Sequence, residues 1–401
     1  MSCLCKSAVA SITSSTGSGR LNIPAVIDRN VRLLENGSRR RRLAFPELRR
    51  HFGAAQLIST FSHLNPNMSI DEVYGNYVLA QIADRLGWNE EVVFNCAYDN
   101  IQPGHDTPKG HRVQYVIVNP PLLDPEQVIH LQPELHYDPQ AVMRNGQNRI
   151  KSAPEQHIEE FRRRYDEIEA IFIQHAGSGR VSERLCHIRE DFLRLLGLPI
   201  LREEPFSYSL TRIMADVLES LANQGYPFWE MPVPADRERY LERTFLVEGV
   251  DARLHRQPVH WQNGVFSYEY DRSGRREIPQ AEVFEALRRY ELVPTMPLVI
   301  LATATAPQLP HLGGRIWKSY APVHVDAQAR WLGIPETNET LILSTEGYRP
   351  LLAYHQNKEF SGFPAIYLTY GAAWIRRALR EGLQLRAEFK RVVYGDDPDE
   401  L

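Results

Sequence analysis

Several polar side chains that could do chemistry together lie at the end of the first predicted strand. The apolar run 56–61 predicts this strand, and Ser59, Ser62, His63 and Asn65 lie within it or shortly after it. A serine hydroxyl becomes a nucleophile when a base or a polarising group lies beside it, and His63 is the adjacent residue. We therefore predict that Ser62 and His63 are catalytic and that Ser59 and Asn65 bind substrate.

Candidate binding groups also follow two later predicted strands. Asp99 follows the run 91–98, where a carboxylate can hold an ammonium group or a ribose hydroxyl, or can instead cap the next turn. His175 and Arg180 enclose a Gly-Ser-Gly turn after the run 170–174, and backbone N–H groups of such a turn can bind an anion. A tight connection without a ligand is the alternative there. We predict that Asp99, His175 and Arg180 bind substrate.

No combination of histidines, cysteines and carboxylates has the spacing of a metal site. His105 and His111 lack a third ligand at a recognisable spacing, and among the four cysteines only Cys3 and Cys5 lie close together. We therefore expect no metal. The scattered cysteines also indicate a reducing compartment, so we expect a cytoplasmic location.

The elements that must hold these residues alternate between strands and helices. Capping boxes or serines open the helical patterns, and glycines close several of them. This alternation predicts an α/β fold, with a Rossmann-like, mostly parallel sheet, helices on both of its faces, and a smaller mixed C-terminal domain. The predicted helices are 69–86, 152–168, 182–197, 209–225 and 280–290, and the other predicted strands are 113–118, 244–248 and 298–304.

Shifts in composition divide the 401 residues into three parts. Residues 1–45 are expected to form a flexible, basic segment, and the absence of acids before Asp28 leaves a targeting role open. Residues 46–271 are expected to form the Rossmann-like catalytic domain, with a polar, proline-rich insertion near 119–154. Residues 272–401 are expected to form the mixed α/β domain.

Positive charge is concentrated near the start of the chain, although the net charge is −4. Arginine offers a planar fork for phosphate oxygens, so this cluster predicts contact with tRNA, and a solvated segment is the alternative. No apolar run reaches the roughly 18 residues that a bilayer requires, so we expect no membrane partner. The arginines of the cluster are Arg39, Arg40, Arg41, Arg42, Arg49 and Arg50.

Several short segments occur in the order of the motifs of class I aminoacyl-tRNA synthetases. The chain resembles that family over roughly residues 54–290. The resemblance implies a Rossmann-like core and adds Asn76 and Asp251 to the expected substrate-binding residues. The matching segments are Asn65-Pro66, Tyr74-Gly75-Asn76, Tyr98-Asp99, Gly249-Val250-Asp251 with His255, and 272–276.

The chain departs from the family at the two cationic elements that act on ATP. Val73 occupies the place of the first signature histidine, and the loop 272–276 contains no lysine. In the family, these groups stabilise the phosphate during amino-acid activation. We therefore expect no cofactor, and ATP with Mg²⁺, bound by Arg180 and the loop 272–276, is the alternative.

A synthetase-like chain without ATP chemistry is similar to cyclodipeptide synthases, which transfer an aminoacyl group from aminoacyl-tRNA to a serine. Tyr226 and Glu230 have the spacing of that family's Tyr/Glu pair, which implies that they act with Ser62. We expect an aminoacyltransferase of dipeptide-type biosynthesis, with aminoacyl-tRNA or a small amino-acid substrate as its partner. The alternatives are an ATP-dependent adenylating ligase or nucleotidyltransferase, and a non-catalytic nucleotide-binding regulatory protein. The oligomeric state stays open.

Overall fold

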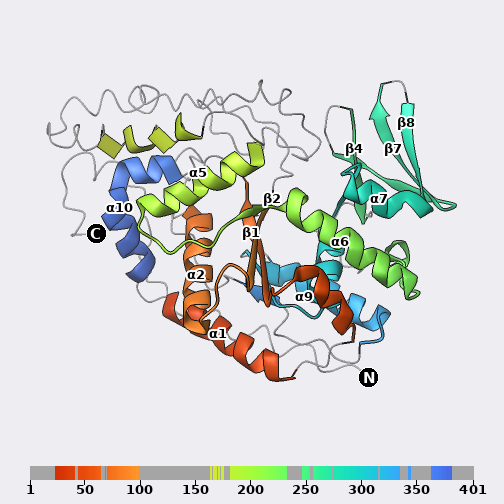
Figure 1. Cartoon of the computed structure of the whole chain (residues 1–401), viewed down its shortest axis with the longest axis horizontal. Helices are drawn as coiled ribbons and strands as arrows, with labels where there is room; N and C mark the ends of the chain where they lie inside the picture. Colours follow the sequence, from red (N-terminus) through yellow and green to blue (C-terminus); the bar gives the residue numbers. More distant parts are fainter. Residues whose placement is uncertain are drawn as a thin grey trace.

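The central sheet has five parallel strands in the order β11-β10-β1-β2-β3. Figure 1 labels two of them, β1 and β2, near the middle of the molecule. The runs predicted at 56–61 and 91–98 are β1 and β2, which pair directly. From β1 the chain adds β2 and β3 on one side, and later β10 and β11 on the other. The direction of strand addition therefore reverses between β1 and β10. The strands are β1 (Leu57–His63), β2 (Val93–Tyr98), β3 (Glu204–Pro205), β10 (His311–Gly313) and β11 (Ile342–Ser344).

The structure is a computed structural model that describes part of the chain. The predicted insertion at 119–154 and the predicted strand 113–118 lie outside the described residues. Within them, no helix is both long enough and apolar enough to cross a membrane. The described residues are 23–40, 44–64, 68, 70–98, 163–175 without 165, 169 and 172, 181–232, 246–252, 256–272, 274–314, 317–334, 342–344 and 363–381.

Helices cover both faces of the parallel sheet. Leu57 and Val93 belong to one buried core and Ile58 and Cys96 to another, because side chains alternate between the two faces of a strand. The predicted α/β fold with helices on both faces is confirmed at this level. The first core includes α1 (Ile23–Arg40), α2 (Ile70–Leu86), α5 (Val181–Leu195) and α10 (Phe363–Glu381), and the second includes α6 (Phe206–Asn223), α7 (Val283–Arg288) and α8 (Met296–Ile300).

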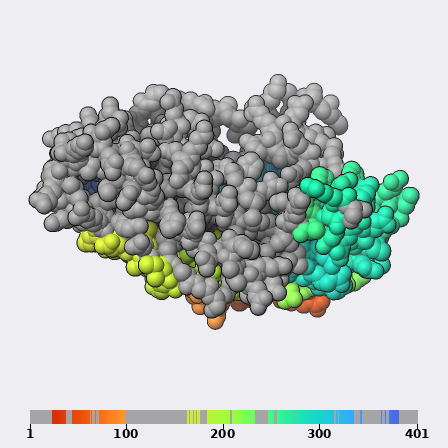
Figure 2. All heavy atoms as spheres, turned by 90° about the horizontal axis from the view of Figure 1, so that it is seen from above, coloured from red at the N-terminus to blue at the C-terminus, as the bar shows by residue number. Residues whose placement is uncertain are grey.

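Two antiparallel sheets of three strands accompany the parallel sheet. In one, β4 lies between β5 and β9, and in the other, β7 lies between β6 and β8. Figure 2 shows atoms of this region, coloured green to turquoise, at one end of the molecule. Part of the predicted loop 272–276 forms the start of β8. The strands are β4 (Val247–Val250), β5 (Arg256–Pro258), β6 (His260–Gln262), β7 (Val265–Asp271), β8 (Gly274–Pro279) and β9 (Leu292–Pro294).

Two of the predicted strands are helical instead. Residues 170–174 continue a helical segment described from residue 163, and Ile171 is buried whereas Ile173 is 66% exposed. In a strand these two side chains would share a face. The run 298–304 lies in α8 and the π-helical turn η6 (Leu301–Thr305), and its side chains are buried. A fully buried helix and a buried strand have the same continuous apolar sequence, so the pattern could not separate them.

The parallel sheet crosses the domain boundary expected at residue 272. Both β10 and β11 come from the segment that was expected to form a separate domain, yet β10 pairs with β1 and β11 pairs with β10. The division into 46–271 and 272–401 therefore does not coincide with the sheet.

A glycine allows α2 to approach β1 closely. The helix ends at Gly87, as predicted, with a φ of 65°. Within the helix, a Cβ on Gly75 would overlap the ring of Phe61 in β1. Close helix–strand packing therefore accounts for Gly75.

Replacing Gly75 with alanine is expected to destabilise the fold by about 1–2 kcal/mol. Overpacking against Phe61 costs about 1–3 kcal/mol, and the better helix propensity of alanine offsets up to about 1 kcal/mol. Urea unfolding measures the loss, and Gly274→Ala is the control because a Cβ there meets nothing within 4 Å. Adding Phe61→Ala to Gly75→Ala should remove the clash. Equal stability losses for Gly75→Ala with and without Phe61 would contradict the packing explanation.

Candidate functional site

A β-bulge aims Ser62 at the helices on one face of the sheet. Ser59 pairs with Asn95 and Ser62 pairs with Ala97, so three steps along β1 match two along β2. In a regular strand, Ser59 and Ser62 would point to opposite faces. The extra residue re-aims Ser62 to the face that contains α2 and α5. Ser62 thereby lies at the carboxyl end of the central strand, beside the point where strand addition reverses, which is where open α/β sheets bind ligands.

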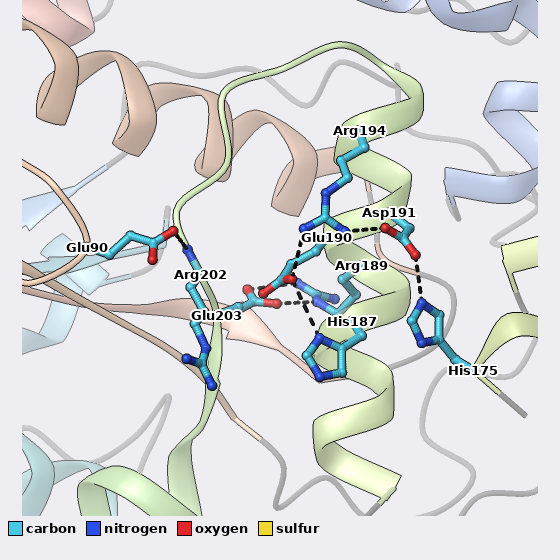
Figure 3. Close-up of polar contacts among 9 residues, drawn as sticks. All are labelled: Glu90, His175, His187, Arg189, Glu190, Asp191, Arg194, Arg202 and Glu203. Atoms are coloured by element: carbon cyan, nitrogen blue, oxygen red, sulfur yellow. Dashed lines mark hydrogen bonds and ion pairs between the residues drawn. The ribbon is translucent and has the colours of Figure 1, made fainter. Parts of the chain in front are cut away.

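Ser62 contacts a buried arginine that is itself held by two carboxylates. The Arg189 Nη2 donates to Ser62 Oγ at 2.8 Å, while its Nε and Nη2 donate to Glu203 at 2.6 and 3.2 Å. Nη1 lies 3.5 Å from Glu72. Ser62 and Arg189 are 0% and 1% exposed. These four residues are called the Arg189 hub, and Figure 3 shows its Arg189–Glu203 pair.

The charge of Arg189 is fixed by its partners. Burial disfavours the cation, but the carboxylates of Glu203 and Glu72 outweigh this effect and raise the pKa of Arg189. A two-point contact with Glu203 also sets the plane of the guanidinium. The hub therefore presents a permanently charged, rigid donor to the Ser62 hydroxyl.

Sequence reasoning did not find the hub beyond Ser62. Glu72 completes the capping-box pattern Ser69-Ile-Asp-Glu72, which accounts for an acid there without a distant partner. Arg189 follows Ile188, which lies on the apolar face of its helix. An arginine in an apolar stripe is a usable signal, because a buried charge requires partners. The partners of Arg189 could not be predicted, because they are distant from it in the sequence.

Asn76 and Ser59 lie in a buried polar layer between α2 and the sheet. Asn76 Nδ2 donates to the carbonyl of Glu72 at 3.1 Å, and Asn95 Nδ2 lies 3.5 Å from Asn76 Oδ1. Ser59 Oγ and Asn95 Oδ1 are buried without a hydrogen-bond partner in the described structure. The structure thus brings three predicted residues, Ser59, Ser62 and Asn76, to the same face of the sheet.

His175 is paired, but not with Ser62. Its Nε2 lies 2.6 Å from Asp191 Oδ2, and Figure 3 shows the two side chains facing each other. Burial raises the pKa of Asp191, but hydrogen bonds from His175 and Arg194 outweigh this and lower it. Arg189 and Asp191 are two residues apart on α5 and therefore do not face the same side. His175, which was predicted to bind substrate, is therefore paired with Asp191 in the described structure, whereas Ser62 is paired with Arg189.

Tyr226 and Glu230 lie at the amino ends of the parallel strands, whereas Ser62 lies at their carboxyl ends. They follow α6, which begins directly after β3 and runs 18 residues away from its carboxyl end. The ring of Tyr226 lies 5.7 Å from those of Phe45 and Trp331. Phe45 precedes β1 in the chain, so its contact with Tyr226 places Tyr226 near the amino end of β1. Their sequence spacing thus reflects local packing, and the structure does not bring them to Ser62.

Arg49 also lies at the end of the sheet where the parallel strands begin. It lies in η1 (Pro46–Phe52) and donates to the carbonyls of Pro307 and Gln308, at 3.2 and 2.9 Å, which precede β10. Burial lowers the pKa of Arg49. This guanidinium therefore ties η1 to the segment before β10, and its contact with tRNA stays a prediction.

Of the remaining predicted site residues, the side chains of two are described in the structure and those of the others are not. Asp251 accepts a hydrogen bond from Gln257 Nε2 at 2.7 Å, after the end of β4 and away from the parallel sheet. Arg50 lies in η1 with Arg49. The side chains of His63, Arg39 and Arg40, and the whole of Asn65, Asp99, Arg180, Arg41 and Arg42, lie outside the described residues.

A second buried polar group lies on the other face of β1. His311 Nε2 is 2.5 Å from Thr60 Oγ1, and His311 Nδ1 is 2.8 Å from Thr303 Oγ1. The Thr303 hydroxyl donates to the carbonyl of Val299, so it accepts from Nδ1–H, and Nε2 accepts from Thr60. Burial lowers the pKa of His311 to about 3. A neutral histidine is therefore built into the junction of β1 and β10.

His311 is expected to make the protein sensitive to acid. Between pH 6.5 and 3 the unfolded chain binds a proton that the folded chain does not, so stability falls as the pH is lowered. From pH 6.5 to 4.5 the loss is about 2 kcal/mol. Urea unfolding across this range measures it, and His311→Gln should flatten the slope by that amount. Equal slopes for both proteins would contradict a neutral His311.

No protein-family model matches the sequence, and no curated protein matches it. Within the described residues, no group of three or more histidines, cysteines and carboxylates could hold a metal ion.

Proposed function

We propose that the chain is a Rossmann-like acyltransferase in which Ser62 accepts an aminoacyl group and passes it to an amine. The observation that carries this is the hydrogen bond from the buried Arg189 to Ser62 Oγ, at the carboxyl end of the central strand. The strand order supports the Rossmann-like assignment, because strands added first to one side of β1 and then to the other are typical of that fold.

The Arg189 hub favours nucleophilic chemistry at Ser62. A cationic N–H donor stabilises negative charge on Oγ as the hydroxyl loses its proton. His63 is the proposed base. Oγ attacks the carbonyl of an aminoacyl ester, the ester C–O bond breaks, and the released alcohol takes a proton. The amine of the acceptor then attacks the serine ester. This step forms an amide and regenerates the Ser62 hydroxyl.

Aminoacyl-tRNA is the proposed donor, since the chemistry above needs an ester that is already activated. The competing use of ATP draws less support from the geometry. Arg276 of the segment 272–276 is 2.8 Å from Glu291 and lies over the ring of Tyr270 at 5.4 Å. These contacts occupy a guanidinium that would otherwise be available to phosphate.

Ser62 is fully covered in this structure, so the donor reaches it only when covering groups move. The test is transfer of a labelled aminoacyl group from aminoacyl-tRNA to the purified protein, comparing the natural chain with Ser62→Ala. Label on the natural chain alone supports the proposal. Absence of label and product with every standard aminoacyl-tRNA overturns it.

A further inference from the structure

Two consecutive side chains near the end of β1 meet the same face of the sheet. Phe61 lies against α2, because a Cβ on Gly75 would overlap its ring. Ser62 contacts Arg189 of α5, and α2 and α5 belong to the same core. Thr60 points to the other face, where its hydroxyl meets a side chain of β10. The alternation of a regular strand therefore breaks directly before the proposed nucleophile, as expected for a β-bulge.

A side-chain hydrogen bond ties β1 to β10 at the start of the bulge. The register of the two strands pairs Ile58 with His311 and Ser59 with Leu312, and Thr60 is the next residue of β1. The Thr60 hydroxyl donates to His311 Nε2 at 2.5 Å. His311 is itself held in the ladder by its pairing with Ile58. Thr60 is thus attached to a residue whose place in the sheet is already fixed.

The imidazole of His311 is held in one orientation. Its Nδ1 lies 2.8 Å from Thr303 Oγ1, and the Thr303 hydroxyl donates to the carbonyl of Val299 in α8. Thr303 therefore accepts from Nδ1–H, which leaves Nε2 as the acceptor for Thr60. Thr60, Thr303 and His311 are all buried, so losing the hydroxyl of Thr60 would leave a buried acceptor unsatisfied.

The residue after Thr60 is held from the opposite side. The ring of Phe61 packs on α2, and a Cβ on Gly314 would lie 3.7 Å from Phe61 Cβ. Gly314 lies between β10 and α9 (Trp317–Trp331). Thr60 and Phe61 are therefore anchored to different elements. A shift of this segment by one residue would turn Ser62 away from α5, and it would require both anchors to be lost.

We propose that Thr60 and His311 are positioning residues, which hold the bulge of β1 in place and thereby keep the Ser62 hydroxyl against Arg189. Thr60 and Ser62 make their contacts on opposite faces of the sheet, so a change at His311 is expected to alter a contact that it does not touch. The effect on catalysis rests on the proposed acyl transfer at Ser62, whereas the placement of the hydroxyl does not.

Crystal structures of three variants test the placement of Ser62. Thr60→Ala removes the hydroxyl, His311→Ala removes its acceptor, and Thr60→Ser keeps the hydroxyl. In both alanine variants, Ser62 Oγ is expected to lie more than about 3.5 Å from Arg189 Nη2, beyond hydrogen-bond distance. In Thr60→Ser the contact of 2.8 Å should be retained. A Ser62–Arg189 hydrogen bond that persists in every alanine variant that folds would overturn the proposal.

Kinetics of aminoacyl transfer test the consequence for the reaction. Thr60→Ala is expected to lower kcat about 10- to 100-fold, because misplacing a reacting group by about 1 Å can cost 10²-fold. The KM for aminoacyl-tRNA should stay unchanged, and Thr60→Ser should restore kcat. Thr60→Ala and Thr60→Ser both lack the methyl group, so a difference between them reports on the hydroxyl alone. Equal losses of kcat in the two variants would contradict the positioning role.

A buried threonine on another element provides the control. Thr211 of α6 is 1% exposed, and its hydroxyl has no hydrogen-bond partner in the described structure. Thr211→Ala should therefore leave both kcat and the Ser62–Arg189 contact unchanged. If the natural chain transfers no aminoacyl group, the proposed function fails, and the crystal structures still decide whether Thr60 and His311 place Ser62.

Discussion

Replacing Arg189 with leucine is expected to lower the free energy of unfolding by about 3–5 kcal/mol. The substitution leaves Glu203 and Glu72 buried without the cation that they share, at 5% and 6% exposure. Burying a charge without its partner is costly, whereas loss of the arginine's packing alone is a smaller effect. Chemical denaturation of the folded protein, followed by circular dichroism, measures the difference.

The pH dependence of this loss identifies its cause. A carboxylate left alone in the core is easier to bury in its protonated form, so the loss should be smaller at pH 5 than at pH 8. Arg194→Leu is the matched control, because this arginine lies on the same helix with its side chain 56% exposed. Its ion pairs with Glu190 and Asp191 should contribute at most about 1 kcal/mol. A loss for Arg189→Leu that equals the control, or that does not change with pH, would contradict the hub.

Replacing Ser62 with alanine is expected to slow amide formation at least about 10³-fold, since removing a nucleophile eliminates the covalent route. The contacts of Arg189 with Glu203 and Glu72 remain, so the protein should keep its fold. Ser220→Ala is the control, because Ser220 lies in α6, which packs on the other face of the sheet from Arg189. Product formation is followed by mass spectrometry with a pool of aminoacyl-tRNAs. Normal activity in Ser62→Ala would contradict the covalent mechanism.

Local patterns in the sequence were sufficient for much of the fold. The helices that begin near Ser69, Ser182 and Ser209 form close to their predicted bounds, as α2, α5 and α6. Capping residues and glycines act within one turn of the chain, so their effect is readable without tertiary contacts. The first two strands were equally readable, because each is a short apolar run between polar turns.

The candidate site depended on contacts that no local pattern contains. A bulge between Ser59 and Ser62 decides which face Ser62 meets, and it is defined by pairing with β2. Arg189 reaches Ser62 across 127 residues of sequence. Conversely, the four-residue spacing of Tyr226 and Glu230 suggested a site, but the path of α6 takes both to the other edge of the sheet. Spacing predicts proximity within an element and says little about its position in the fold.

The most direct test of the proposed function is intact-protein mass spectrometry after the chain is mixed with aminoacyl-tRNA and quenched rapidly in acid. Acid protonates amines and so preserves a serine ester that an amine would otherwise attack. The covalent mechanism predicts a mass increase of one aminoacyl residue, located on the peptide that contains Ser62 and absent from Ser62→Ala. Product formation without any adduct, or an adduct that persists in Ser62→Ala, would contradict it.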